Sequence, residues 1–203
     1  MFDGDLKLLF MNQKRYMVEH TYCGVDPSLR HGSMLMATFA QADGKLVLVK
    51  ASQVALWGKI NDCSLGHRGV GLDDDAKKIS SFGTSLAITI NANTPEGCKL
   101  FIDWVPGALF GKSSPKLASY MAMIMGAFMA HVNRPYEFVH PSTLRSALGA
   151  KPREDKLVVQ ETFLRHLDPN GQKICSDILR EDEVDALILA AYPYFRKKME
   201  IVT

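Results

Sequence analysis

Three strand-like runs follow one another near the N-terminus, before any long helical pattern begins. They cover residues 22–25, 33–40 and 46–49. The second and third runs are joined through Asp43 and Gly44, a dipeptide that is typical of a tight turn between paired strands. This order predicts an antiparallel meander of three strands as the first part of the fold.

The remainder of the chain alternates helical and strand-like patterns. A helical pattern over 72–92 precedes a buried strand at 99–102, and a strongly apolar helix that starts near Pro115 precedes a strand at 136–139. Further helical patterns follow at 141–147, 154–167 and 180–198. A meander followed by alternating helices and strands predicts an α/β fold, with one mixed sheet and helices on both of its faces.

Length and composition indicate one sizeable hydrophobic core. The chain has 203 residues, of which 47% are hydrophobic. We therefore assign residues 1–20 to an N-terminal extension and residues 21–203 to a single domain. The 24 basic and 22 acidic residues give a net charge of only +2, so binding to nucleic acid would depend on local clusters of lysine and arginine.

The cysteines are scattered along the chain, at Cys23, Cys63, Cys98 and Cys175. The sequence contains no CxxC pair, which argues against a structural zinc site or a disulfide framework and favours a reducing compartment. The N-terminal residues carry no long apolar run, so they are typical of neither a secretory signal nor a membrane span. The sequence predicts a cytoplasmic protein with no membrane partner.

Four aspartates occupy positions from which their side chains could converge. Asp26 and Asp103 each follow an apolar strand-like run, so they would lie side by side if the two strands are neighbours in one sheet. Asp182 and Asp185 are three residues apart and share one face of the last helix. Asp185 also borders the apolar stripe of that helix, so its side chain should point toward the sheet.

Convergence of these carboxylates would require cations, because like charges at close range repel one another. Oxygen ligands without histidine or cysteine suit Mg²⁺ or Mn²⁺. Two such ions about 4 Å apart can activate a water and stabilise the leaving oxygen in phosphodiester cleavage. Taken singly, each acid also has a simpler role, as a turn former, a strand terminator or a helix cap.

The stretches that carry these acids resemble motifs of the RuvC-type Holliday-junction resolvases, whose fold is RNase H-like. They are GVDPSLRHGSMLM, LFIDWVPGALF with the helix after it, and EDEVDALILA. A fourth stretch, PSTLRSALGAKPREDK at 141–156, is similar to the family segment that runs from a proline through a basic residue to an Asp-Lys pair. The resemblance spans about residues 22–190, with the motifs in the family's order.

The resemblance implies a metal-dependent endonuclease of DNA recombination and repair, which cuts Holliday junctions or other branched DNA. It implies Asp26, Asp103, Asp182 and Asp185 as catalytic ligands of Mg²⁺ or Mn²⁺, with two ions in each site. It implies Lys156 as the catalytic cation nearest the chemistry, with Arg145 as its supporting contact. The expected substrate-binding residues are Arg145, Lys151, Arg153, Trp104, Phe110 and Lys112.

Three positions depart from the family pattern. Asp103 stands where the family usually has glutamate, and a side chain shorter by one methylene would alter metal spacing or preference. Pro106 stands where a resolvase can carry an aromatic residue that stacks on an unpaired base, so Trp104 and Phe110 are the nearest substitutes. Ser28 replaces a frequent glycine in the first loop.

DNA and a second copy of the chain are the expected partners. The methionine-rich helix after Lys116 is apolar almost all round, so it is either buried on several sides or binds a partner. It occupies the place of the dimer helix in RuvC-like proteins, and a symmetric junction is best cut by a two-fold enzyme, so we expect a homodimer. Basic candidates for contacts to the phosphate backbone are Arg30, His67, Arg68, Lys112, Arg134, Lys151 and Arg153.

Two alternative functions remain open. A non-catalytic DNA-binding or assembly module could keep the same fold, although Asp185 on an otherwise apolar face favours an enzyme, because a buried carboxylate without a partner is costly. A sugar or acetate kinase-like phosphotransferase also begins with a strand followed by aspartate and glycine. Such an enzyme would need a glycine-rich phosphate loop and a second, duplicated subdomain, for which the chain is too short.

Overall fold

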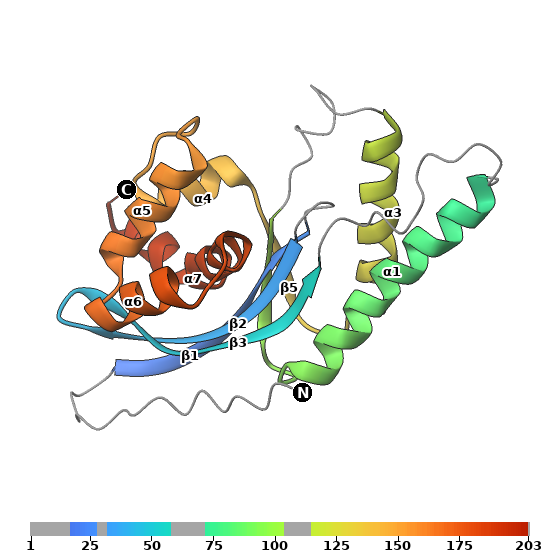
Figure 1. Ribbon diagram of the computed structural model, residues 1–203. Coiled ribbons are helices and arrows are strands. Elements are labelled where there is room, and N and C mark those ends of the chain that lie inside the picture. The colour runs from blue at the N-terminus through green and yellow to red at the C-terminus, as the bar shows by residue number, and fades with distance from the viewer. Residues whose placement is uncertain (1–16, 28–31, 58–71, 104–114, 203) are drawn as a thin grey trace.

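The computed structural model describes residues 17–27, 32–57, 72–103 and 115–202, which form one mixed sheet flanked by helices. The five strands lie in the order β3-β2-β1-β4-β5 (Figure 1). The first three form an antiparallel meander, and β4 and β5 run parallel to β1. The strands are β1 Met17–Asp26, β2 Gly32–Ala42, β3 Lys45–Trp57, β4 Lys99–Asp103 and β5 Tyr136–Val139. The predicted mixed sheet is confirmed.

The first three strands are longer than the apolar runs predict. β1 begins at Met17, so it includes residues 17–20, which the sequence pattern assigns to the N-terminal extension. β3 lies at the edge of the sheet and continues through Lys50 and Gln53. Edge strands expose one side to water and carry polar residues there, so an apolar pattern detects only their centre.

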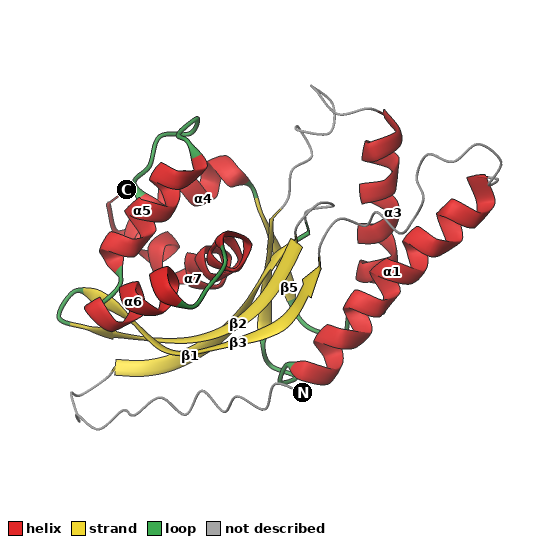
Figure 2. Ribbon diagram, viewed as in Figure 1, coloured by secondary structure: helices red, strands yellow, loops and turns green. Residues whose placement is uncertain are grey.

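Helices cover both faces of the sheet (Figure 2). α1 and α3 lie on one face, and α4 to α7 lie on the other. Their bounds are α1 Leu72–Asn93, α3 Pro115–His131, α4 Pro141–Leu148, α5 Lys156–His166, α6 Pro169–Asp177 and α7 Glu181–Val202. Within the described part of the chain, no helix has both the length and the apolar character that a membrane span needs.

The sequence pattern missed α6. Asp168 caps this helix by accepting a hydrogen bond from the Gly171 amide, and Pro169 begins the first turn. Its buried residues are Gly171 and Cys175. The sequence pattern of this segment is typical of a loop, because its apolar face is small and its first turn contains Pro, Asn and Gly.

The two faces of the sheet have separate cores. One core lies between the sheet and the two helices α1 and α3. There the methionine-rich helix α3 buries Ile124, Met125 and Phe128 against the sheet and α1. Gly83 of α1 allows the close approach, because a β-carbon there would collide with the backbone carbonyl of Ile124. α3 therefore contributes methionine to the core of the described fold, as one of the two alternatives for this helix predicts.

The other core is centred on α7, which crosses β1 and β2 at close range. Its residues Val184, Leu187, Ile188 and Ala191 are buried, which confirms the apolar stripe predicted for the last helix. Gly24 of β1 lies directly beneath this helix. This contact brings α7 against β1 close to the carboxyl end of the strand.

We expect Gly24→Ala to lower the free energy of unfolding by about 3 kcal/mol, toward the upper end for an overpacked core. A β-carbon at this position would collide with the backbone carbonyl of Ala186 and would lie 2.8 Å from the amide nitrogen of Ala190. Urea unfolding followed by circular dichroism measures the change. Gly126→Ala is the control, because its β-carbon would meet nothing within 4 Å, and an unchanged stability of Gly24→Ala would contradict the packing argument.

Candidate metal centre

The candidate site lies at the carboxyl ends of the two central parallel strands. Asp26 is the last residue of β1 and Asp103 is the last residue of β4. The register pairs Val25 with Ile102, so both aspartates leave the sheet at the same edge, as predicted. Crevices outside the carboxyl ends of parallel strands are common ligand sites in α/β proteins.

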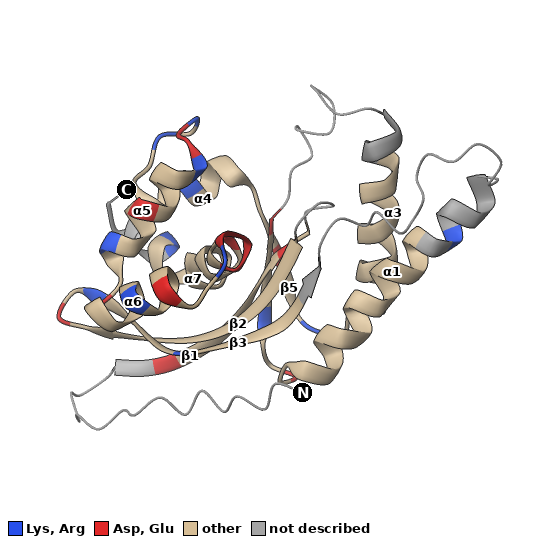
Figure 3. Ribbon diagram, viewed as in Figure 1, with Lys and Arg blue, Asp and Glu red and all other residues tan. Residues whose placement is uncertain are grey.

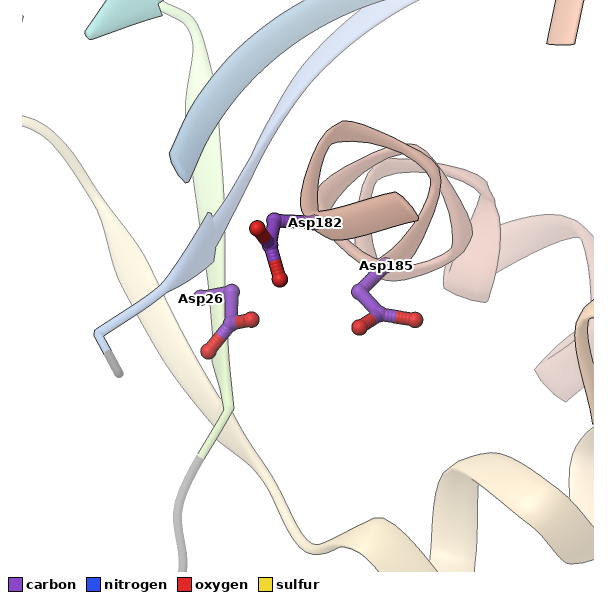
Figure 4. Close-up of side chains that lie close together, drawn as sticks. All are labelled: Asp26, Asp182 and Asp185. Carbon is purple, nitrogen blue, oxygen red and sulfur yellow. The ribbon is translucent and has the colours of Figure 1, made fainter. Parts of the chain in front are cut away.

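Three of the four predicted acids form a tight group. Asp26, Asp182 and Asp185 each offer one carboxylate oxygen, and these oxygens lie within 4.8 Å of one another. Figure 4 shows the three side chains turned toward a common point, with Asp26 coming from β1 and the other two from α7. This donor set of carboxylate oxygens fits a hard divalent cation such as Mg²⁺ or Mn²⁺.

The first turn of α7 is held in place by contacts to the sheet and by its own cap. Ser33 of β2 is fully buried, and its hydroxyl donates to the backbone carbonyl of Asp182 at 2.6 Å. Glu183 accepts a hydrogen bond from the backbone amide of Arg180 at 2.9 Å, which caps the start of the helix. Asp182 and Asp185 are therefore presented from an anchored turn.

Lys156 lies against the acidic group. Its ammonium nitrogen is 2.6 Å from Asp185 Oδ2, 3.0 Å from Glu181 Oε1 and 3.8 Å from Asp182 Oδ1. Burial alone would lower the pKa of this ammonium, but the hydrogen bonds and charges of Asp185 and Glu181 outweigh it and raise the pKa. Lys156 thus stays charged and is half exposed, within reach of an incoming anion.

Asp103 stands apart from the group of three. Its Oδ1 is buried and has no hydrogen-bond partner among the described residues. Burial, followed by the negative charge of Asp185, raises the pKa of Asp103 from 3.8 to about 7, although the charge of Arg145 works against this shift. A buried carboxylate oxygen without a partner fits a place for a cation at this edge of the sheet.

We expect Asp103→Asn to stabilise the metal-free protein by about 2 kcal/mol at neutral and higher pH. The folded-state pKa is raised from 3.8 to about 7, so the wild type loses stability as the pH rises through this window. The difference in the free energy of unfolding between variant and wild type should therefore vanish below pH 3.8. Urea unfolding in EDTA across this pH range measures it, with the exposed Asp177→Asn as the control. Equal stability of variant and wild type above about pH 7 would contradict this prediction.

The basic residues of α4 and of the connection from α4 to α5 have different surroundings. Arg145 donates from Nη1 to the backbone carbonyl of Pro152 at 2.8 Å, which braces the connection that leads to Lys156. Lys151 and Arg153 are exposed in that connection. Figure 3 shows that the loop between α4 and α5 carries basic residues beside acidic ones. Exposed basic side chains such as these are available to contact phosphate.

The prediction that Arg134 contacts the phosphate backbone is wrong. Its side chain is only 8% exposed. The guanidinium donates to the backbone carbonyls of Thr94 at 2.7 Å and of Asn91 at 2.6 Å. Asn91 lies in the last turn of α1 and Thr94 follows the helix, so Arg134 joins the end of α1 to the residues before β5.

The remaining expected substrate contacts lie outside the described residues. They are Trp104, Phe110, Lys112, Arg30, His67 and Arg68. The departures from the family pattern at Ser28 and Pro106 also lie there.

Sequence reasoning missed Gln160, a buried neighbour of the site. Its side-chain amide donates to Asp185 Oδ1 at 2.8 Å and to the backbone carbonyl of Glu181 at 3.2 Å. Gln160 is four residues after Lys156, so both residues share one face of α5. A polar residue at this spacing from Lys156, within an apolar stretch, was the signal in the sequence.

Comparisons with known proteins show the fold. A scan of protein-family models finds no match, and no curated protein matches the sequence. The structure of Thermus thermophilus RuvC matches with a TM-score of 0.52 and 14% identity, over 89% of this chain and 96% of that chain. The same protein in complex with a Holliday junction substrate also gives a TM-score of 0.52, at 16% identity, over 88% and 95%.

A eukaryotic structure gives a comparable match. The yeast mitochondrial Holliday junction resolvase Ydc2 has a TM-score of 0.51 and 11% identity, over 90% of this chain and 84% of that chain. All of these identities are low, but the matches extend over nearly the whole of each chain. The chain therefore has the RNase H-like fold of the RuvC-type Holliday-junction resolvases.

Proposed function

We propose that the protein is a divalent-metal-dependent endonuclease that resolves Holliday junctions or other branched DNA by phosphodiester hydrolysis. The observation that carries the proposal is the group formed by Asp26, Asp182 and Asp185, whose carboxylate oxygens lie within 4.8 Å of one another. This group lies beside the charged Lys156 on a resolvase fold. A fold alone does not determine function, so the proposal depends on this site.

The aspartates are the proposed metal ligands. Asp26, Asp182 and Asp185 would hold Mg²⁺ or Mn²⁺, and Asp103 would supply its buried oxygen to the same edge, with two ions per site. When bound, such ions polarise the phosphate, activate water and stabilise the leaving oxygen. The carboxylates at this edge repel one another, and this repulsion favours the binding of cations before DNA binds.

The basic residues are the proposed contacts to the substrate. Lys156 is positioned to donate to a phosphate oxygen when DNA enters, because its ammonium already lies at the border of the acidic group. Lys151 and Arg153 would contact the phosphate backbone from the exposed connection between α4 and α5. Arg145 would support this surface through its hydrogen bond to the Pro152 carbonyl.

The stacking contacts and the dimer are further parts of the proposal. Trp104 and Phe110 would stack on bases and Lys112 would contact phosphate, from the segment that follows β4. A homodimer would place two sites on the two-fold symmetric junction, so that both strands are cut in one complex.

Cleavage of a labelled four-way junction, compared with a linear duplex of the same sequence, tests the proposal. The wild-type protein is assayed with Mg²⁺, with Mn²⁺ and with EDTA. We expect paired nicks on the junction, little cutting of the duplex, and no cutting in EDTA. Binding of the junction without cleavage in either metal would contradict the enzyme and favour a non-catalytic DNA-binding module.

A further inference from the structure

Gln160 joins α5 to the first turn of α7 at the candidate metal centre. Only 9% of Gln160 is exposed. Its Nε2 donates to Asp185 Oδ1 at 2.8 Å and to the backbone carbonyl of Glu181 at 3.2 Å. Both acceptors are oxygens, so the NH₂ end of the amide must face α7. One side chain thus holds both a carboxylate of the acidic group and the helix turn that carries it.

The two oxygens of Asp185 have partners of different kinds. Oδ2 is 2.6 Å from the ammonium of Lys156, whose side chain is 44% exposed. Oδ1 accepts from the neutral and buried amide of Gln160. The ammonium competes with a metal ion for the negative charge of Asp185, whereas the amide fixes the direction of the carboxylate and leaves that charge in place.

We propose that Gln160 is a positioning residue of the metal centre, which orients Asp185 toward Asp26 and Asp182. The inference rests on the proposed function, because it requires that this acidic group binds a divalent cation. Without the amide, Lys156 would be the stronger remaining partner of Asp185 and would draw the carboxylate away from the shared point. The affinity of the DNA-free protein for metal should then fall.

Mn²⁺ binding to the full-length, DNA-free protein, measured by calorimetry, tests this role. Gln160→Met keeps the length of the side chain but removes the donor, and we expect the affinity to fall about 10- to 100-fold. Gln160→Asn keeps an amide but shortens it by one methylene, so it should weaken binding as well. Gln172→Met is the matched control, because that glutamine donates to the backbone carbonyl of Leu167 on α5's C-terminal side, away from the acids.

A double-mutant cycle separates positioning from a general structural role. In an Asp185→Ala background, Gln160→Met should cause no further loss of Mn²⁺ affinity, because the residue acts through Asp185. Gln160→Met should still lower thermal stability in the Asp185→Ala background. The reason is that it removes the hydrogen bond to the Glu181 carbonyl whether or not Asp185 is present. A further loss of affinity equal to that in the wild type would overturn the inference.

The same titration distinguishes the inference from the function on which it rests. Unchanged Mn²⁺ affinity in folded Gln160→Met and Gln160→Asn, with binding that still depends on Asp26, would overturn the role of Gln160 alone. Absence of Asp26-dependent Mn²⁺ binding in the wild type would overturn both the inference and the proposed metal centre.

Discussion

Asp185→Asn is expected to lower the rate of junction cleavage by at least about 1000-fold, equivalent to about 4 kcal/mol of lost transition-state stabilisation. Asp185 is one of the three residues whose oxygens lie within 4.8 Å of one another, and it also contacts both Lys156 and Gln160. The substitution keeps the size of the side chain and removes its charge. It should therefore impair the chemical step without disrupting α7.

Single-turnover cleavage of a labelled four-way junction measures this loss, and a gel mobility shift measures junction binding in parallel. Binding should be retained, because removal of a negative charge does not weaken attraction to phosphate. Asp177→Asn is the matched control, since Asp177 is exposed at the end of α6. Cleavage by Asp185→Asn within about tenfold of the wild type would mean that this carboxylate is not part of a metal-dependent active site.

Lys156→Met is expected to change cleavage and metal affinity in opposite directions. Loss of the ammonium should slow junction cleavage about 100-fold, as for removal of one donor to a developing charge. The affinity of the DNA-free protein for Mn²⁺ should rise about fivefold, because a partly exposed ion pair that competes with the metal is worth up to about 1 kcal/mol. The competing ion pairs join Lys156 to Asp185 at 2.6 Å and to Glu181 at 3.0 Å.

Calorimetry with Mn²⁺ and single-turnover cleavage, performed on the same preparations, provide the two measurements. Lys173→Met on α6 is the control, because Lys173 is exposed and has no place in the proposed site. Weaker Mn²⁺ binding by Lys156→Met would show that the lysine supports the metal centre and does not compete with it.

The order of the elements could be predicted from local patterns. Apolar runs, the Asp43-Gly44 turn and the helical periodicity of 72–92 depend on neighbours in the sequence, so the meander and the helices on both faces followed from them. Strand ends and short helices were less accurate. Polar positions on β3 and the small apolar face of α6 carry little hydrophobic signal, so β3 is longer than predicted and α6 was missed.

The sequence by itself determined which acids are candidates for the site. Asp26 and Asp103 end their strands, and the spacing of Asp182 and Asp185 puts both on one helix face. These are local properties, set by strand ends and by helical repeat. The resemblance to resolvase motifs selected the same residues together with Lys156.

Only the tertiary structure decided how these side chains are arranged. It groups Asp26 with Asp182 and Asp185, and it leaves Asp103, with its buried Oδ1, outside that group. It also turns Arg134 inward, away from any role in binding phosphate. The hydrogen bond from Ser33 to the Asp182 carbonyl joins residues 149 positions apart, and Gly24 lets α7 lie directly on β1. Such contacts depend on how distant elements pack against one another, and no local pattern encodes that packing.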